Sequence, residues 1–262
     1  MSSSLFDIAR RALEVLQQRP SALVTDIDGT LSRIVPRPQD ATVSGRARDA
    51  LRRLAPRLDC LAVITGRELD VARRMVGVEG LTFVASYALG AAGRAPPDIG
   101  AVLRVRDEVG PLLAPWPCVQ LEEKDVSFAL HYRNCEDGPA MRLRLLALVQ
   151  PLAAREGAKL LEGKQVIEVA PRALPDKGEA LLALLDGRGI RGAVFIGDDL
   201  ADAAAFRELR RRRAETGAPG LCIAVIDRET DPAVLAAADA AVHGVDDVER
   251  LLELLADLLD EA

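Results

Sequence analysis

The sequence lacks any pair of cysteines at metal-ligand spacing. Its four cysteines, Cys60, Cys118, Cys135 and Cys222, are scattered along the chain, form no CxxC motif and have no histidine nearby at ligand spacing. This pattern argues against a zinc site and against disulfides. We therefore expect thiols in the core of a protein from a reducing compartment, and we predict a cytoplasmic location.

The sequence also lacks an apolar run long enough to cross a bilayer, and it lacks an excess of positive charge. Residues 1–19 place charged side chains among apolar positions at helical spacing, which predicts an amphipathic helix and not a signal peptide. A net charge of -6 and a pI near 5.2 argue mildly against nucleic acid or an anionic membrane as the main partner. The arginine run at 210–213 falls where a helix should end, so we interpret it as a solvated last turn favoured by the helix dipole. We expect a monomer or weak homo-oligomer without nucleic-acid or membrane partners.

What the sequence does contain is an alternation of strands and helices. With 262 residues, 49% of them hydrophobic and 28% charged, the chain is long enough for one large α/β domain or two smaller ones. Short apolar runs without internal alternation suit strands that are buried on both faces of a parallel sheet. We expect a doubly wound, Rossmann-like parallel sheet with strands at 22–24, 61–64, 81–85, 193–196 and 221–226 and helices at 44–54, from 68, at 177–185, at 201–212 and from 247.

This alternation breaks between residues 90 and 100, where glycine and proline are frequent. Alternating strand patterns follow one another beyond the break, and such strands suit an antiparallel sheet with one exposed face. The expected elements there are strands at 127–133, 158–161 and 165–169 and helices at 101–113 and 139–155. We predict a discontinuous core domain, residues 1–92 and 173–262, interrupted by a smaller α+β domain at 93–172.

Polar side chains follow several of the expected strands. Asp26 and Asp28 come after the first strand, two residues apart and therefore on one side, and an Asp-Gly turn follows them. Ligands of open α/β sheets bind beyond the carboxyl ends of the strands. Each feature has a simpler interpretation as a turn, a helix cap or a surface lysine, but their convergence on one sheet edge favours a functional site. The other members of this set are Thr65, Lys177, Asp198 and Asp199.

These residue types together suit phosphoryl transfer. A phosphate ester repels a carboxylate nucleophile, so attack requires cationic screening. A Mg²⁺ ion held by Asp26 and Asp198, with Lys177 as a point charge, would supply that screening. Asp26 would attack in line to give an aspartyl phosphate, and Thr65 would donate a hydrogen bond to a phosphoryl oxygen. Asp28 would protonate the leaving oxygen and then activate water.

The motifs and their order resemble a known superfamily. DIDGTL at 26–31, VITGR at 63–67, the lone Lys177 and IGDD at 196–199 are similar to the four motifs of haloacid-dehalogenase-like (HAD) phosphatases. That superfamily places an α/β cap between its second and third motifs. Within the inserted segment, EEK at 122–124, HYR at 131–133, and GK at 163–164 with Glu168 and Pro171 resemble the cap pattern of trehalose-phosphate phosphatases. The resemblance covers roughly residues 22–255.

The resemblance implies a role for each matching residue. It implies that Asp26 is the nucleophile and Asp28 the acid/base, with Thr65 and Lys177 completing the catalytic group. It implies a Mg²⁺ ion on Asp26, the Ile27 carbonyl and Asp198, within an acidic set that also contains Asp28, Asp199 and Asp202. The implied substrate is a sugar phosphate, bound by Gly66, Arg67, Glu122, Lys124, Arg133, Lys164 and Glu168. His131 is interpreted as a packed or hydrogen-bonded strand residue.

Two departures from the family pattern leave the substrate open. An Asn-His-Gly-x-Glu stretch is usual after the third strand, but Ser86-Tyr87-Ala88-Leu89-Gly90 stands here, and GDDxTDE is replaced by GDDLADA at 197–203. Trehalose 6-phosphate is the first hypothesis, and a glucosylglycerol, sucrose or mannosylglycerate phosphate is the alternative. A non-hydrolysing sugar-phosphate sensor is a further alternative, against which the intact Asp26/Asp28 pair argues, and a phosphomutase is a third.

Overall fold

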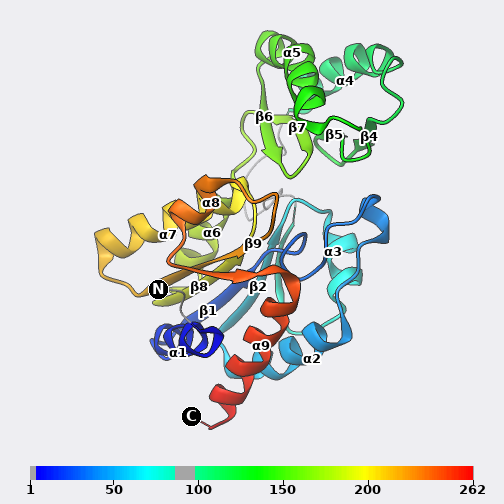
Figure 1. Ribbon diagram of the computed structural model, residues 1–262. Helices are drawn as coiled ribbons and strands as arrows, with labels where there is room; N and C mark the ends of the chain where they lie inside the picture. Colours follow the sequence, from blue (N-terminus) through cyan, green and yellow to red (C-terminus); the bar gives the residue numbers. More distant parts are fainter. Residues whose placement is uncertain (1–3, 86–97, 262) are drawn as a thin grey trace. The chain divides into compact units, whose positions relative to one another are not determined.

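Two β-sheets organise the chain, each in its own unit (Figure 1). The computed structural model describes residues 4–85 and 98–261. Residues 4–85 and 175–261 form the larger unit, and residues 98–174 form the smaller one.

The larger unit is built on a six-stranded sheet in the order β10-β9-β8-β1-β2-β3, in which every neighbouring pair is parallel. The central strands are buried along their whole length, as their uninterrupted apolar sequences predict. The chain runs outward from β1 through β2 and β3, and later outward on the other side from β8 through β9 and β10. This order confirms the doubly wound sheet. The strands are β1 Ser21–Thr25, β2 Cys60–Thr65, β3 Thr82–Ala85, β8 Gly192–Gly197, β9 Gly220–Ile226 and β10 Ala240–His243.

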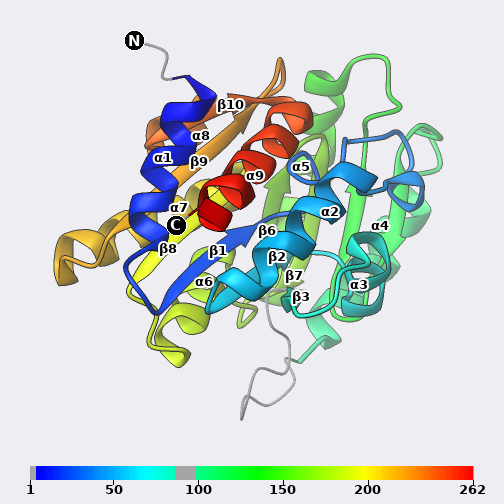
Figure 2. The ribbon, with the colours of Figure 1, turned by 90° about the horizontal axis from the view of Figure 1, so that it is seen from below.

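Helices cover both faces of this sheet (Figure 2). Apolar residues of α1, α2, α3 and α9 join those of the strands in one hydrophobic cluster. On the other face α6 packs against α7, which in turn packs on β8 and α8. The helices are α1 Leu5–Leu16, α2 Gly45–Leu54, α3 Leu69–Val76, α6 Lys177–Gly187, α7 Leu200–Thr216, α8 Pro232–Ala237 and α9 Gly244–Glu261, and two 3-10 turns lie at Pro38–Asp40 and Ala55–Arg57.

Local sequence explains where the first helices begin. The Ser4 hydroxyl accepts a hydrogen bond from the Asp7 amide, and the Asp7 carboxylate accepts one from the Ser4 amide, which makes a capping box for α1. Ser44 caps α2 in the same way by accepting from the Ala47 amide at 3.1 Å. The expectations of an amphipathic first helix and of a helix at 44–54 are confirmed.

The smaller unit is an antiparallel sheet in the order β4-β5-β7-β6, packed against two helices. Phe128, Leu130, Ile167 and Val169 are fully or almost fully buried in a cluster with side chains of both helices. Their neighbours along each strand alternate to the opposite face, as the sequence pattern predicts. The elements are α4 Gly100–Leu112, β4 Gln120–Glu123, β5 Phe128–His131, α5 Gly138–Glu156, β6 Ala158–Gly163 and β7 Val166–Pro171.

The cysteine prediction was half wrong. Cys118 and Cys135 form a disulfide with their Cα atoms 5.1 Å apart. They lie before β4 and after β5, so the antiparallel pairing of these two strands brings them together across 17 residues of sequence. Cys60 and Cys222 are buried thiols, as expected.

Three elements had no counterpart in the sequence prediction. β4 has the polar sequence QLEE, and β10 has the alanine-rich sequence AAVH, so neither shows the β-branched pattern that marks a strand. The short helix α8 begins after Asp231, whose side chain accepts from the Ala233 amide. Tertiary pairing, and not local preference, therefore makes β4 and β10 strands.

The interpretation of the arginine run as a solvated last turn was correct only in part, because Arg211 is exposed but its neighbours make contacts with the rest of the fold. Arg210 donates to the carbonyls of Ala236 and Ala237, and Arg212 donates to the Ile190 carbonyl. Arg213 donates to the Gly220 carbonyl and pairs with the Asp239 carboxylate. These bonds fasten the end of α7 to neighbouring segments.

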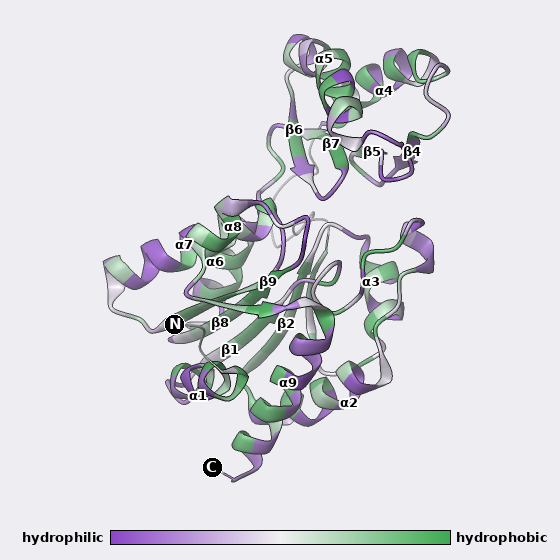
Figure 3. Ribbon diagram, in the orientation of Figure 1, coloured by the Kyte–Doolittle hydropathy of each residue, from purple (hydrophilic) through white to green (hydrophobic). Residues whose placement is uncertain are grey.

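Hydropathy follows the layers of the larger unit, with apolar residues on the strands and polar residues toward the end of α7 (Figure 3). Of the helices in residues 4–85 and 98–261, none combines the length and the apolar character that crossing a membrane requires.

Candidate active site

The candidate site lies at the carboxyl ends of β1 and β8, where the strand order of the larger unit reverses. Asp26 follows β1 and Asp198 follows β8, and the Asp26 amide donates to the Ile196 carbonyl at 3.0 Å. Both side chains are almost completely buried. Such a reversal point is where open α/β sheets bind ligands. The predicted convergence of the two acidic motifs is therefore present in the structure.

Lys177 joins these acids from the first position of α6. Its side chain is 2% exposed, and its Nζ atom lies 3.1 Å from Asp26 Oδ1 and 2.7 Å from Asp202 Oδ1. Asp176 starts the helix with a capping box that includes Glu179, which sets the place where Lys177 leaves the backbone. The helix dipole makes a positive charge in the first helical turn unfavourable. At Lys177 two buried carboxylates offset this electrostatic cost.

Burial dominates the electrostatics of these carboxylates. The pKa of Asp26 is raised to about 7, mainly by burial and further by the neighbouring carboxylates, against the lowering effect of the Lys177 ammonium. Burial likewise raises the pKa of Asp202 well above its ordinary range, and the Lys177 ammonium again opposes the shift. A cation placed among these groups would favour their ionised forms.

Asp202 holds the loop after β8 in place. Its Oδ2 atom accepts from the amides of Asp198 at 2.8 Å and Asp199 at 3.1 Å, while Oδ1 accepts from Lys177. Asp199 caps α7 by accepting from the Asp202 amide at 3.0 Å. A Cβ on Gly197 would lie 2.2 Å from Asp202 Cγ, so only glycine fits there. Asp202 therefore positions the acidic loop, and Asp199 both caps the helix and adds charge.

The loop after Asp26 wraps closely around Asp198. Gly29 has a φ of +85°, and a Cβ there would lie 2.0 Å from Asp198 Oδ2. Thr30 Oγ1 donates to Asp198 Oδ1 at 3.2 Å. Thr30 was missing from the predicted site, because its contact joins residues 168 positions apart.

The structure does not fit the prediction that the Ile27 carbonyl faces a metal ion. That oxygen accepts from the amides of Thr30, Leu31 and Ser32 at 3.2, 2.9 and 2.8 Å. A carbonyl oxygen has two lone pairs, and three N–H groups already converge on this one. We therefore withdraw Ile27 from the proposed ligand set.

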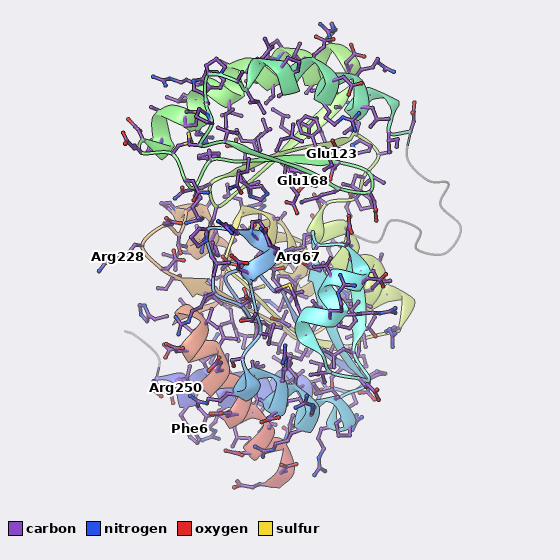
Figure 4. All side chains as sticks on the ribbon, turned by 90° about the vertical axis from the view of Figure 1, so that its right-hand side faces the viewer. Phe6, Arg67, Glu123, Glu168, Arg228 and Arg250 are labelled. Carbon is purple, nitrogen blue, oxygen red and sulfur yellow. A yellow bond between two sulfur atoms is a disulfide. The ribbon has the colours of Figure 1, made fainter. Side chains whose placement is uncertain are left out.

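Asp28 lies at the edge of the site and is held by Arg67. The Arg67 guanidinium donates to both Asp28 oxygens, from Nε at 2.6 Å and from Nη2 at 2.7 Å, and also to the Pro38 carbonyl at 3.0 Å. The Asp28 side chain is 38% exposed, in contrast to that of Asp26. Thr65 ends β2, is buried, and accepts from the Arg67 amide at 3.2 Å across Gly66. Figure 4 labels Arg67.

The donor set suits a hard cation. Carboxylate oxygens of Asp26, Asp198 and Asp202 lie within 4.8 Å of one another, and all three residues are buried. Such oxygens are the usual ligands of Mg²⁺. Asp202 already serves Lys177 and two amides, so Asp26 and Asp198 are the residues that would hold the ion. The residues present therefore fit the predicted Mg²⁺.

A second group of predicted residues lies on the face of the smaller unit's sheet opposite its hydrophobic cluster. Glu122 Oε2 lies 2.7 Å from His131 Nε2. Lys124 Nζ donates to Glu168 Oε2 at 2.9 Å, and Ser127 Oγ donates to Glu168 Oε1 at 2.6 Å. Glu168 is labelled in Figure 4. The prediction of a hydrogen-bonded His131 agrees with this geometry, whereas Ser127 was missed because an isolated serine carries no pattern.

Arg133 and Lys164 meet at the turn between β6 and β7. Arg133 Nη2 donates to the Lys164 carbonyl at 3.1 Å, and the Tyr132 amide donates to the Gln165 carbonyl at 3.0 Å. Gln165 has a φ of +59°, which marks a tight turn. The end of β5 thus fixes the turn that carries Lys164. The predicted loop at 86–90 lies outside the described residues.

Comparisons with known proteins agree with this arrangement. The sequence model of the family described as Trehalose-phosphatase matches residues 24–230. A trehalose-phosphate phosphatase of Mycolicibacterium paratuberculosis is 32% identical over 261 residues, which cover 92% of this chain and 64% of that protein. The chain therefore spans less than two thirds of the length of this relative.

Solved structures show the same fold. The C-terminal domain of a C. albicans trehalose-6-phosphate phosphatase superposes with a TM-score of 0.81 at 22% identity, covering 95% of this chain and 96% of that one. A haloacid dehalogenase-like hydrolase from Bacteroides thetaiotaomicron gives a TM-score of 0.60 at 14% identity, covering 92% and 98%. The fold is HAD-like, and with its family match over most of its length the chain belongs to the trehalose-phosphatase family.

Proposed function

We propose that this chain is a Mg²⁺-dependent phosphoric monoester hydrolase that releases phosphate from a phosphorylated disaccharide, with trehalose 6-phosphate as the first candidate. The observation that carries the proposal is the convergence of Asp26, Asp198 and Lys177 at the strand-order reversal. Family membership and the named relative supply the substrate candidate.

The first half of the proposed reaction transfers the phosphoryl group to the protein. An Asp26 carboxylate oxygen attacks phosphorus, and the bond from phosphorus to the sugar oxygen breaks as the aspartyl phosphate forms. Asp28 gives its proton to the leaving sugar oxygen. Lys177 offsets negative charge beside Asp26, and the Thr65 hydroxyl donates to a phosphoryl oxygen. Asp26 and Asp198 would hold a Mg²⁺ ion, which would supply charge neutralisation at the phosphoryl oxygens.

The second half returns Asp26 to its starting state. Asp28 takes a proton from water as that water attacks phosphorus, and the bond between Asp26 and phosphorus breaks to release inorganic phosphate. In its acid form Asp28 is uncharged, so its two hydrogen bonds to Arg67 lose part of their charge-assisted strength during the cycle. Arg67 is therefore in direct contact with the proposed acid/base Asp28. We retain Arg67 and Gly66 as proposed substrate contacts.

The proposed sugar contacts are Glu122, Lys124, Arg133, Lys164 and Glu168 of the smaller unit. Carboxylates accept and ammonium groups donate, so this mixture suits the many hydroxyl groups of a disaccharide. The half-buried Lys124–Glu168 pair, with side chains 18% and 15% exposed, offers both kinds of group at one place.

Phosphate release tests the proposal. We expect Mg²⁺-dependent turnover of trehalose 6-phosphate within a panel of sugar and glycoside phosphates, loss of turnover in EDTA, and loss in Asp26→Asn. Turnover of another panel member alone would keep the chemistry and change the substrate. Binding of sugar phosphates without turnover by the wild-type chain would favour the sensor alternative.

A further inference from the structure

One row of side chains on and next to strand β5 lies between Glu122 and Glu168, the two glutamates of the proposed sugar site. Ser127, Ala129 and His131 are two residues apart and therefore share one face. Ala129 is paired with Glu122 of β4 on one side and with Glu168 of β7 on the other. The two carboxylates thus flank a single methyl group on the face opposite the hydrophobic cluster.

Ser127 reaches diagonally from this row to Glu168. The Lys124 amide donates to the Ser127 carbonyl at 2.9 Å, so these two residues face each other where the β4–β5 hairpin closes. From there Ser127 Oγ binds Glu168 Oε1 at 2.6 Å and Lys124 Nζ binds Oε2 at 2.9 Å. Ser127 is 6% exposed, so its hydroxyl makes this bond away from bulk water. Hydrogen bonds of a hydroxyl to a carboxylate at this length belong to the strong, charge-assisted kind.

His131 reaches along the other diagonal to Glu122. Its Nε2 atom lies 2.7 Å from Glu122 Oε2, and the histidine side chain is 22% exposed while that of Glu122 is 42% exposed. An ionised carboxylate only accepts, so Nε2 carries the proton in this contact. The more exposed member is the glutamate, which is therefore the one available to a sugar.

We propose that Ser127 and His131 are positioning residues for sugar recognition, which hold Glu168 and Glu122 in the rotamers that meet the sugar hydroxyl groups on either side of Ala129. The inference rests on the proposed function. A glutamate side chain has three rotatable bonds, and fixing them before binding removes that ordering cost from the binding step. Ser127 and His131 would act on substrate binding, through the two glutamates that they position. Their substitution should therefore change KM and leave the chemical step at Asp26 unchanged.

The test is a double-mutant cycle with two substrates. We expect Ser127→Ala to raise KM for trehalose 6-phosphate, or for the preferred panel member, by about tenfold, with kcat within about twofold of wild type. Turnover of p-nitrophenyl phosphate, which has no sugar, is expected to stay at the wild-type level. In a Glu168→Ala background, Ser127→Ala is expected to cause no further rise of KM. Ser127→Thr keeps the hydroxyl group, so its KM is expected to equal that of the wild type. His131→Leu, which removes the N–H donor, is tested in wild type and in Glu122→Ala as the parallel cycle.

Glu123→Gln is the matched control, because Glu123 alternates to the other face of β4 and pairs with Arg106. A wild-type KM in both Ser127→Ala and His131→Leu would overturn the inference, as would an equal rise of KM with and without the glutamate. Loss of p-nitrophenyl phosphate turnover, or an altered circular dichroism spectrum, would identify a structural role instead. If the wild-type chain turns over p-nitrophenyl phosphate but no sugar phosphate, the proposed function itself fails, and the inference fails with it.

Discussion

Gly29 is the residue at which backbone geometry and the acidic site are most tightly joined. We expect Gly29→Ala to abolish metal-dependent phosphate release and to weaken Mg²⁺ binding. The added Cβ would lie 2.0 Å from Asp198 Oδ2, at a φ of +85° that costs roughly 1–3 kcal/mol for other residues. Isothermal titration with Mg²⁺ and a phosphate-release assay measure both effects.

Gly45→Ala is the control for this prediction. Gly45 opens α2, and an added Cβ there meets no atom within 4 Å. Alanine in a helix is more favourable than glycine by about 0.5–1 kcal/mol, so this variant should be as stable as wild type or more stable, with unchanged activity. Equal Mg²⁺ affinity of the two variants would contradict the close approach of Gly29 to Asp198.

Asp202 is expected to matter for stability as well as for activity. Asp202→Ala would leave the Lys177 ammonium, 2% exposed, without one of its two carboxylates and would free two loop amides. Breaking a buried pair in this way costs about 3–5 kcal/mol, which urea unfolding measures. Glu215→Ala, which removes an exposed partner of Arg211 in the same helix, should cost about 0.5 kcal/mol or less. Similar losses of unfolding free energy in Asp202→Ala and Glu215→Ala would contradict the buried contacts of Asp202 with Lys177 and the loop amides.

At the scale of single residues, the sequence predicts which side chains lie close together in the site. It does not predict which hydrogen bonds each of them makes. Asp26, Asp198 and Lys177 could be placed together because each lies at the end of a strand or the start of a helix, and parallel strands align those ends. The error at Ile27 concerned the direction of a carbonyl, which depends on the local turn. Thr30 and Ser127 were missed because their partners come from distant segments and no local pattern marks them.

At the scale of elements, buried strands with uninterrupted apolar sequences were predictable, and strands defined by their partners were not. β4 is polar and becomes a strand because it pairs with β5, and β10 is an alanine-rich edge paired with β9. The missed disulfide has the same origin, since strand pairing alone brings Cys118 near Cys135. The β4–β5 hairpin that it closes carries Glu122, Lys124 and the two positioning residues.

Reduction of this disulfide is therefore expected to loosen the hairpin. A cross-link that closes a loop of this size contributes roughly 3 kcal/mol. With dithiothreitol, hydrogen exchange should accelerate in peptides that cover 118–135 and stay unchanged in peptides that cover β1 and β8. Cys118→Ser should show the fast exchange without reductant and no further response to it. Unchanged exchange of the hairpin on reduction would contradict this expectation.

At the scale of the whole molecule, the sequence allowed the two-part organisation to be proposed because a parallel α/β pattern stops and later resumes. The doubly wound order follows from that resumption, since β8 returns beside β1 and not beside β3. The return creates the strand-order reversal and brings Asp198 to Asp26. It also concentrates three buried carboxylates and one lysine in the larger unit, so the stability of the fold becomes linked to pH and to Mg²⁺.

The metal-free protein is expected to lose stability as the pH rises from about 4 to about 7. Burial raises the pKa of Asp26 from 3.8 to about 7, so in this range the folded state binds a proton that the unfolded state has released. The raised pKa of Asp202 acts in the same direction. Exposed carboxylates whose pKa is lowered by arginines, such as Asp59 and Asp246, change stability mainly below about pH 4, outside this window.

Thermal unfolding in EDTA between pH 5 and pH 8, beside Asp26→Asn and beside excess Mg²⁺, tests this linkage. We expect the wild-type melting temperature to fall by at least about 5 °C over that range. Asp26→Asn should flatten the fall, because its amide does not titrate. Mg²⁺ should raise the melting temperature more at pH 8 than at pH 5, since a cation binds the ionised carboxylates and stabilises only the folded state. A wild-type melting temperature that rises with pH in EDTA, or a Mg²⁺ effect that is larger at pH 5, would show that Asp26 is not the buried, proton-binding carboxylate on which the proposed chemistry depends.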